Sequence, residues 1–457
     1  MSDYEDYSKA EFGDKRLSDR LVRSLDQLAS NPSASISWAC GDPYQAKAIY
    51  RFIGNDEVTL DAITKIAHDV TIKNIVEAKP SVVLGIQDTT ELNYSGLRET
   101  DGLGSIAGRK TARGIEVHSA LAVSEEGEVF GLLAQRLWNR PPEEFGQSTP
   151  LSCRGMPIEE KESYKWLETM DSAGAVFPEG IKLVHVCDRE GDIYELFCKA
   201  ERDGALYLCR NSFDRKIKDE IGLKKLADRI ISHPEGGRIT IRVSRDSHTK
   251  RVARDAEIAI KYGKCNIAKP HQLRNNGELP EYIEIHFVSA EEIDPPDGQD
   301  KLLWNLITNV PTESFEDAIT RIQWYTQRWK IELFHRTLKD GCKVEELQPE
   351  TAAKLMKLVV IYSIIALQIM LLTYIARTRS DESCEIFFTE DEWRILYKVA
   401  NKTKKLPEKP PTIQEAVTMI AKLGGFLGRK SDGSPGVTVV WRGLTNFYTI
   451  LDAVPYF

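Results

Sequence analysis

Residues 325–339 read YTQRWKIELFHRTLK. The stretch has no proline or glycine and is rich in good helix formers, so it predicts one continuous helix. At 3.6 residues per turn, four polar side chains lie within about 60° of one another around the helix axis. They are Tyr325, Arg328, Glu332 and Lys339. The other side of the helix is an apolar face that can dock on a core, formed by Trp324, Ile331, Phe334 and Leu338.

This stripe of one carboxylate, two cations and a phenol suits a metal ion and phosphate groups. Glu332 can hold a divalent cation, while Arg328 and Lys339 can bind phosphate oxygens. The simpler interpretation is that Glu332 only pairs with Arg328 and Arg336, four residues before and after it. For an isolated helix the simpler interpretation is the commoner one, because such exposed pairs are ordinary and weak.

Two other segments place an aspartate at the end of a buried strand. SVVLGIQ predicts a short strand that ends at Asp88, and IKLVHVC predicts another that ends at Asp188. A carboxylate in this position is well placed to hold a metal ion, although it can also simply form a turn. Glu190 and Asp192 are alternatives to Asp188, which we prefer because it ends the strand.

The order and wording of these segments carry a family resemblance. The spacing Tyr-x2-Arg-x3-Glu-x6-Lys resembles the signature of bacterial cut-and-paste transposases of the insertion-sequence-four family. VVLGIQDTTELNY around Asp88 and VHVCDREGDIYEL around Asp188 are similar to the transposon-five branch of that family. The resemblance extends over nearly the whole chain, through AIYRFIGN (48–55), RGIEVHSALAV (113–123), LLWNLITNVPTESFEDA (302–318) and IAKLGGFLGRK (420–430).

The resemblance implies a DDE active site on an α/β, ribonuclease-H-like catalytic core. Asp88, Asp188 and Glu332 would hold two divalent metal ions, Mg²⁺ or Mn²⁺. It also implies that three residues of the stripe, Tyr325, Arg328 and Lys339, bind backbone phosphates.

Further DNA contacts follow from the resemblance alone. Trp304 matches a tryptophan that stacks a base flipped out of the DNA, although a strand tryptophan is by itself more often a core residue. Arg210 matches a DNA-contacting position. Arg20 and Arg51 match positions that contact the transposon end, and without the resemblance they would be read as solvated surface arginines.

The chain divides into three expected domains. Residues 1–75 predict helices and, by resemblance, a DNA-binding domain. Residues 76–376 would form the catalytic domain, with a β-rich insertion at about 211–300, where period-two alternation indicates antiparallel strands. Residues 377–457 would form a helical dimerisation domain. The expected assembly is therefore a homodimer in a synaptic complex with transposon-end and target DNA.

Composition adds weaker constraints. The net charge of −8 argues mildly against a DNA-binding protein, but affinity for DNA depends on local clusters of cations. The 8 cysteines show no CxxC pair, which indicates reduced thiols in the cytoplasm; the resemblance adds association with the bacterial nucleoid. Residues 358–376 form an apolar run just short of the ~20 residues of a membrane span. Its place after residues 325–339 favours a core helix, so we expect no membrane.

The favoured function is cut-and-paste transposition of an insertion sequence, with two-metal phosphodiester hydrolysis, hairpin formation and strand transfer. A DNA-binding derivative that no longer cuts and a metal nuclease without strand transfer are the alternatives. The complete set of Asp88, Asp188 and Glu332 argues against the first alternative. Trp304 and the polar stripe argue against the second, because a plain nuclease needs no support for a hairpin.

Overall fold

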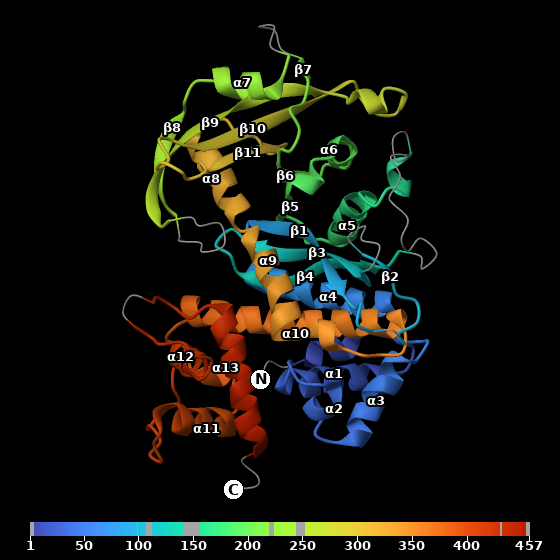
Figure 1. Ribbon diagram of the computed structural model, residues 1–457, viewed down its shortest axis with the longest axis vertical. Coiled ribbons are helices and arrows are strands. Elements are labelled where there is room, and N and C mark those ends of the chain that lie inside the picture. Colours follow the sequence, from blue (N-terminus) through green and yellow to red (C-terminus); the bar gives the residue numbers. More distant parts are fainter. Residues whose placement is uncertain are drawn as a thin grey trace. The chain divides into compact units, whose positions relative to one another are not determined.

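The computed structural model describes residues 4–97, 99–106, 112–140, 156–218, 224–243, 252–429 and 432–453 (Figure 1). The chain forms two compact units, each assembled from separate stretches of sequence. The first unit comprises Met1–Lys79, Thr89–Ser148 and Lys330–Phe457; the second comprises Pro80–Asp88 and Thr149–Trp329. Strand β1 (Val82–Asn93) therefore belongs to both units, its first half to the second unit and its second half to the first.

The first unit begins with the predicted helices. They are η1 (Glu5–Lys9), α1 (Lys15–Ser30), α2 (Ile36–Ala39), α3 (Pro43–Ile53) and α4 (Leu60–Ala78). Each of the four α-helices starts where a polar side chain accepts a hydrogen bond from a first-turn N–H group: Asp14, Ser35, Asp42 and Thr59. Leu21, Leu25 and Leu28 lie at helical spacing along α1 and are fully buried.

The strands of the first unit are β2 (Gly104–Ser105), β3 (Arg113–Ser124), β4 (Val129–Trp138) and the second half of β1. β3 and β4 form an antiparallel hairpin, which turns at Gly127 with a φ of 94°. On its other side β3 lies along β1, where the Tyr94 N–H donates to the Arg113 carbonyl at 2.8 Å. Helix α4 covers β4, and the Thr71 hydroxyl donates to the Leu132 carbonyl at 3.0 Å.

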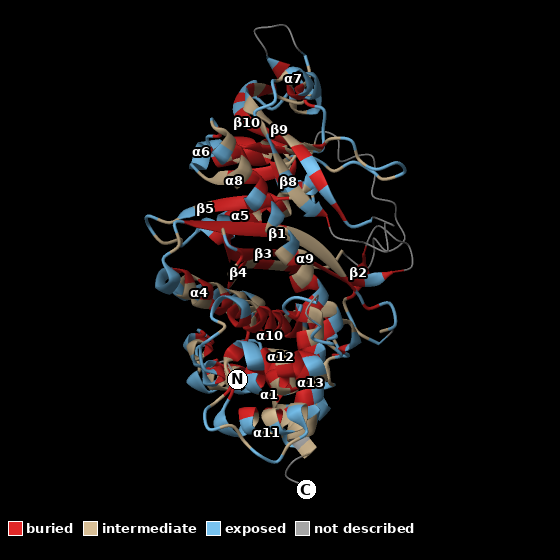
Figure 2. Ribbon diagram, turned by 90° about the vertical axis from the view of Figure 1, so that its left-hand side faces the viewer, coloured by how far each residue is buried: buried red, intermediate tan, exposed pale blue. Residues whose placement is uncertain are grey.

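Helix α10 (Ala352–Thr378) contains the apolar run and is a core helix. Among the described residues it is the one helix long and apolar enough to cross a membrane, and 78% of its most apolar window is buried. It packs against β4, α4, α12 and α13 of the same unit. The Ser363 hydroxyl on α10 accepts a hydrogen bond from the Gln135 amide at 3.0 Å. Figure 2 shows α10 as a largely buried element.

The last part of the first unit contains η8 (Val344–Glu346), η9 (Cys384–Ile386), α11 (Glu390–Asn401), α12 (Ile413–Leu423) and α13 (Val437–Ala453). The described helices η9, α11, α12 and α13 agree with the helical character expected for residues 377–457. α11 and α12 both start with a capping box, in which the cap side chain and a glutamate three residues later exchange hydrogen bonds with the backbone.

Two glycines allow α12 and α13 to approach closely. A Cβ atom added to Gly443 would lie 1.8 Å from the Ile420 carbonyl oxygen, and one added to Gly424 would lie 2.0 Å from the Val439 carbonyl oxygen. Both contacts are with backbone atoms, which cannot rotate away.

We expect Gly443→Ala to destabilise the first unit by about 1–3 kcal/mol, because the two helices must separate to admit the methyl group. The measurement is the urea midpoint of the full chain. Gly436→Ala is the matched control, since a Cβ there meets nothing within 4 Å. Equal midpoints for the two variants would show that the crossing is not as close as described.

The second unit contains one mixed sheet. The strands are the first half of β1, β5 (Lys182–Cys187), β6 (Leu206–Arg210), β11 (Leu303–Thr308), β10 (Tyr282–Glu292), β9 (Arg254–Ala268) and β7 (Ile217–Lys218), in this order, with β8 (Gly237–Val243) on β9. β1, β5 and β6 are parallel, and the remaining pairs are antiparallel. The antiparallel strands expected at about 211–300 are therefore present. They extend the same sheet, because β10 pairs with β11 and β11 pairs with β6.

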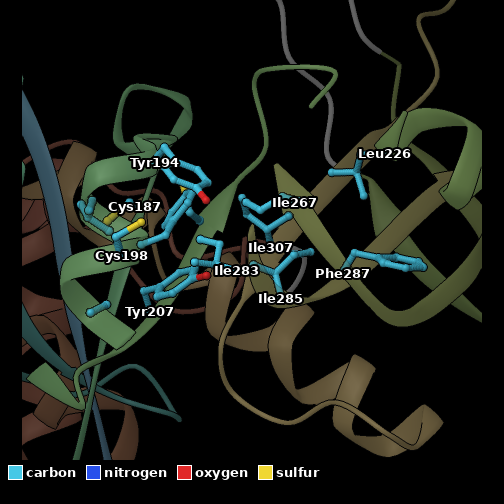
Figure 3. Packing of buried hydrophobic residues seen from close by; sticks show 14 of the residues in the cluster. Cys187, Tyr194, Cys198, Tyr207, Leu226, Ile267, Ile283, Ile285, Phe287 and Ile307 are labelled. Carbon is cyan, nitrogen blue, oxygen red and sulfur yellow. The ribbon is translucent and has the colours of Figure 1, made fainter. Parts of the chain in front are cut away.

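The helices of the second unit are η4 (Ile158–Glu160), α5 (Tyr164–Gly174), η5 (Arg189–Gly191), α6 (Tyr194–Asp203), α7 (Leu226–Ser232), η6 (His271–Leu273) and α8 (Phe315–Thr326). One hydrophobic cluster joins α5 and α6 to the sheet (Figure 3). Within it the Phe197 and Tyr207 rings stack at 4.7 Å. The cluster also takes in Cys187 and Cys209 at the ends of β5 and β6.

The helix predicted over residues 325–339 is interrupted, so that prediction is wrong. α8 ends at Thr326, and the N–H groups of Gln327 and Arg328 donate to carbonyls three residues back. α9 (Trp329–Arg336) follows, and Thr337–Gly341 then widens into a π turn. Residue propensities do not report such local tightening and widening of a helix. Tyr325 and Arg328 belong to the second unit, whereas Glu332 and Lys339 belong to the first.

Candidate active site

In the second unit, three predicted site residues lie at or just beyond the ends of the pairings between neighbouring parallel strands. Ile86 pairs with Val186, and Val186 pairs with Leu208. Two residues further along, the same register places Asp88, Asp188 and Arg210 in one row. Because side chains alternate between the faces of a strand, Asp88 and Arg210 point to the face opposite Cys209, and Asp188 directly follows the last residue of β5. Asp88 does not end its strand as predicted, because β1 continues to Asn93.

Asp188 is held by the turn that follows β5. Its carboxylate accepts a hydrogen bond from the Glu190 N–H at 2.7 Å and caps η5. The Cys209 thiol donates to the Asp188 carbonyl oxygen at 3.3 Å. Burial raises the pKa of the Cys187 thiol, and the charges of Asp188 and Asp88 raise it further. Both carboxylates therefore act on the same thiol, in agreement with the row inferred from the register.

Arg328 provides a positive charge beside Asp88. The Arg328 Nη1 atom lies 3.4 Å from Asp88 Oδ2, and 18% of each side chain is exposed. The guanidinium carbon also lies 6.0 Å from the centre of the Tyr325 ring. The turn that interrupts the predicted helix thus presents Arg328 to the first aspartate.

Trp304 and Tyr325 form an aromatic pair in the same unit. Their rings are 5.6 Å apart at 67°, an edge-to-face arrangement. Tyr325 is buried, whereas Trp304 is partly exposed. Arg210 approaches the same strand, because its Nη2 atom donates to the Leu303 carbonyl at 3.1 Å.

The phenol of Tyr325 lies among the charges of this site. Burial raises its pKa, the positive charges of Arg328 and Arg210 lower it, and the negative charge of Asp188 raises it. The balance keeps the hydroxyl protonated at neutral pH, so Tyr325 can donate a hydrogen bond to an anion. The second unit thus gathers six of the predicted residues: Asp88, Asp188, Arg210, Trp304, Tyr325 and Arg328.

The other two residues of the predicted stripe lie in the first unit. Glu332 is partly buried in the first turn of α9, and Lys339 is partly buried in the π turn. His335 lies between them and is buried. Burial and the charge of Lys339 lower the pKa of His335 to about 3, so the imidazole is neutral.

The arginines predicted to contact the transposon end are both in the first unit. Arg20 on α1 donates to the Gln45 side chain at 3.0 Å. Arg51 on α3 is exposed. Arg51 thus lies where a ligand can reach it, and Arg20 is tied to α3 through Gln45.

The two alternatives to Asp188 have other surroundings. Asp192 is fully buried and bonded to Arg215, and it accepts hydrogen bonds from the Ser212 and Phe213 N–H groups at 2.7 and 3.0 Å. It therefore serves the structure. Glu190 is exposed, 3.6 Å from the Lys165 ammonium.

The donor types in the second unit fit a hard cation. Asp88 and Asp188 offer carboxylate oxygens, the ligand type that Mg²⁺ prefers. Within the described ranges, no group of three or more His, Cys, Asp or Glu side chains stands close enough to hold a metal ion. The two aspartates are thus a partial ligand set by themselves, with Arg328 beside one of them.

Sequence reasoning missed the residues beneath this row. Cys187, Cys209 and Gly191 support the Asp188 turn: a Cβ on Gly191 would lie 2.5 Å from the Cys187 Cβ atom. The sequence did place each cysteine directly before a candidate site residue. That position alone does not say on which face of the sheet the cysteine side chain lies.

Comparison with known families bears on both ends of the chain. A family model for a transposase DNA-binding domain matches residues 4–58, and one for the Tn5 transposase dimerisation domain matches residues 364–457. The chain is a Tn5-like transposase. It is thus a DNA transposase, a class of enzyme that cleaves DNA and transfers strands.

The matched segments of the transposase have distinct places in the fold. The DNA-binding match covers η1 to α3 and includes Arg20 and Arg51. The dimerisation match begins within α10 and includes α11, α12 and α13. The insertion-sequence-four assignment is consistent with both matches. DNA partners and dimer formation follow from the same domains.

Proposed function

We propose that this transposase carries out cut-and-paste transposition of an insertion sequence by metal-dependent hydrolysis, hairpin formation and strand transfer. The observation that supports this most is the level row of Asp88, Asp188 and Arg210, with Arg328 beside the first carboxylate. It occurs in a chain that matches a transposase DNA-binding model near its N-terminus and the Tn5 transposase dimerisation model near its C-terminus.

The strand pairings support a ribonuclease-H-like core as part of this proposal. β4 pairs with β3, β3 lies beside β1, and β1 is parallel to β5 and β6. The division into a DNA-binding domain at 1–75, a catalytic domain at 76–376 and a dimerisation domain at 377–457 belongs to the same proposal.

Asp88, Asp188 and Glu332 would hold two Mg²⁺ or Mn²⁺ ions. Such ions activate the attacking oxygen and stabilise the leaving oxygen in an in-line displacement at phosphorus. The three carboxylates would act as ligands, and neither aspartate would serve as a general acid or base.

The cationic and phenolic side chains would position the DNA backbone. Arg328 can exchange its long contact with Asp88 for two parallel hydrogen bonds to a phosphate, because guanidinium forms bidentate pairs. The protonated Tyr325 hydroxyl and Arg210 would donate to the same phosphates. Lys339 would supply a point charge on the first unit.

Trp304 would support the bend that a DNA hairpin requires. A partly exposed indole held edge-on by Tyr325 offers a fixed surface for an extrahelical base. Stacking contributes about 1–3 kcal/mol per base, which is comparable to the cost of unstacking one base.

We therefore expect Trp304→Ala to slow hairpin formation by about tenfold or more, while the first nick is affected less. Nicked and hairpin products are separated on a denaturing gel after a single turnover. Trp304→Phe, which retains a stacking face, should recover part of the loss. Equal slowing of both steps would assign Trp304 to general packing.

The assembly follows the family expectation. Arg20 and Arg51 would contact transposon-end DNA, and residues 377–457 would pair two chains in a synaptic complex that then captures target DNA. The enzyme would act in the bacterial cytoplasm, associated with the nucleoid when bound to DNA.

Purified protein, a duplex carrying the element end, and Mg²⁺ or EDTA test this function. Mg²⁺-dependent nicks at the boundary followed by hairpins would support transposition. Nicks without hairpins would favour a nuclease without strand transfer. Binding without cleavage would favour a derivative that no longer cuts.

A further inference from the structure

A cavity of about 730 Å³ lies beside the Asp188 turn, within the second unit. It is lined by the segments that follow β5 and β6 and by the loop after β9. The carboxyl ends of neighbouring parallel strands meet at the same edge of a sheet, where ligands of open α/β sheets bind. The cavity therefore adjoins the edge that carries Asp188 and Arg210.

A buried ion pair fixes the floor of this cavity. Asp192 binds Arg215 and also accepts from the backbone of Ser212 and Phe213. The turn after Arg210 is thus held by several hydrogen bonds to one carboxylate. Phe213 lies in this turn and projects outward, and 59% of its surface is exposed.

The exposed Phe213 ring lies next to positive charge. Its centre is 5.7 Å from the guanidinium carbon of Arg215. The ring lines the cavity and is not part of the hydrophobic core. An aromatic face beside cations is the usual arrangement for stacking a nucleic-acid base.

Two further cations line the cavity and keep their charge available. Within the described part of the chain, neither Arg189 nor Lys216 takes part in an ion pair. The carboxylates that share the lining are already engaged by other cations: Glu190 by Lys165, Glu195 by Lys161, Asp214 by Lys225 and Asp192 by Arg215. An anion at the cavity would therefore meet the positive charges of Arg189 and Lys216.

We propose that this cavity binds a single-stranded stretch of DNA, with a base stacked on Phe213 and phosphates at Arg189 and Lys216. Cavities of about 300–1,000 Å³ hold small ligands, so this one suits a nucleotide and excludes a duplex. A duplex also keeps its bases paired and stacked, out of reach of a single ring. The inference rests on the proposed function only for the identity of the strand.

The test measures binding in EDTA, where no cleavage occurs. Fluorescence anisotropy compares the wild-type chain on a blunt element-end duplex with the same duplex carrying a five-nucleotide single-stranded extension. Phe213→Ala should reduce the preference for the extension by about tenfold. Lys216→Gln should also reduce this preference, and its effect should be larger at low salt than at high salt.

Tyr282→Ala is the matched control. Tyr282 is an exposed aromatic residue of the same unit, with the Lys218 ammonium 5.2 Å from its ring, but it lies outside the cavity lining. Its substitution should leave the preference unchanged. A wild-type chain that shows no preference for the extension, or equal losses for Phe213→Ala and Tyr282→Ala, would overturn the proposal.

A competition identifies the source of the strand. Preference for an extension attached to the element end indicates flanking donor DNA, whereas competition by a separate gapped duplex indicates target DNA; both outcomes support the site. Because the assay needs no catalysis, a chain that binds extensions but never cleaves would refute the proposed function and retain this inference. Cleavage by a chain that shows no preference for the extension would support the proposed function and refute this inference.

Discussion

Asp188→Asn is expected to reduce the rate of the first DNA nick by about 10³-fold. A bound divalent ion contributes several kcal/mol to stabilising the charge of a phosphoryl transition state, and each 1.36 kcal/mol corresponds to a factor of ten in rate. Asparagine retains the shape and the capping oxygen that accepts from the Glu190 N–H. The η5 turn should therefore persist, and the loss should reflect the missing negative charge. The measurement is a single-turnover nicking rate in Mg²⁺.

Glu190→Gln is the matched control for this substitution. Glu190 lies two residues further on in the same turn, is exposed, and pairs only loosely with Lys165 at 3.6 Å. We expect its nicking rate to stay within about twofold of wild type, because exposed ion pairs contribute about 0–1 kcal/mol. Comparable losses of nicking rate for both variants would show that Asp188 is not a metal ligand of the nicking reaction.

Arg215→Met is expected to destabilise the protein by about 3–5 kcal/mol, because it leaves the buried Asp192 carboxylate without its cation. The Asp192 side chain is fully buried and the Arg215 side chain is 5% exposed, so water cannot replace the lost partner. The Ser212 and Phe213 N–H groups still bind the carboxylate, but they are neutral. The measurement is the free energy of unfolding in urea.

The comparison for Arg215→Met is Arg242→Met. Arg242 lies 2.9 Å from Asp255 in a pair whose side chains are about two-thirds exposed. Its loss should cost about 0–1 kcal/mol, since solvent screens the remaining charge. If both variants unfold at the same urea concentration, the Asp192–Arg215 pair does not hold the turn.

Local signals in the sequence were sufficient for many elements. The capping box of Thr412 and Glu415 marks the start of α12, and the glycines after Leu423 mark its end. The period-two runs mark the strands of the β-rich insertion. Each of these features is set by residues within a few positions of one another, so pattern and propensity locate it.

Long-range pairing could not be predicted in the same way. The alignment of Asp88 with Asp188 depends on the register between strands a hundred residues apart, and nothing local encodes it. The role of Asp192 was hidden for the same reason, since its partner Arg215 lies beyond a helix and a strand. The turn at Gln327 that separates α8 from α9 is another case, because no proline or glycine marks it.

The most direct test of the central claim is the number of Mn²⁺ ions bound per chain, measured by electron paramagnetic resonance with element-end DNA present. We expect two ions for the wild type and at least one fewer for Asp88→Asn, Asp188→Asn and Glu332→Gln. The control Glu346→Gln, an exposed glutamate paired with Lys343, should bind like the wild type. Unchanged Mn²⁺ binding in all three active-site variants would contradict the assignment of Asp88, Asp188 and Glu332 as the metal ligands.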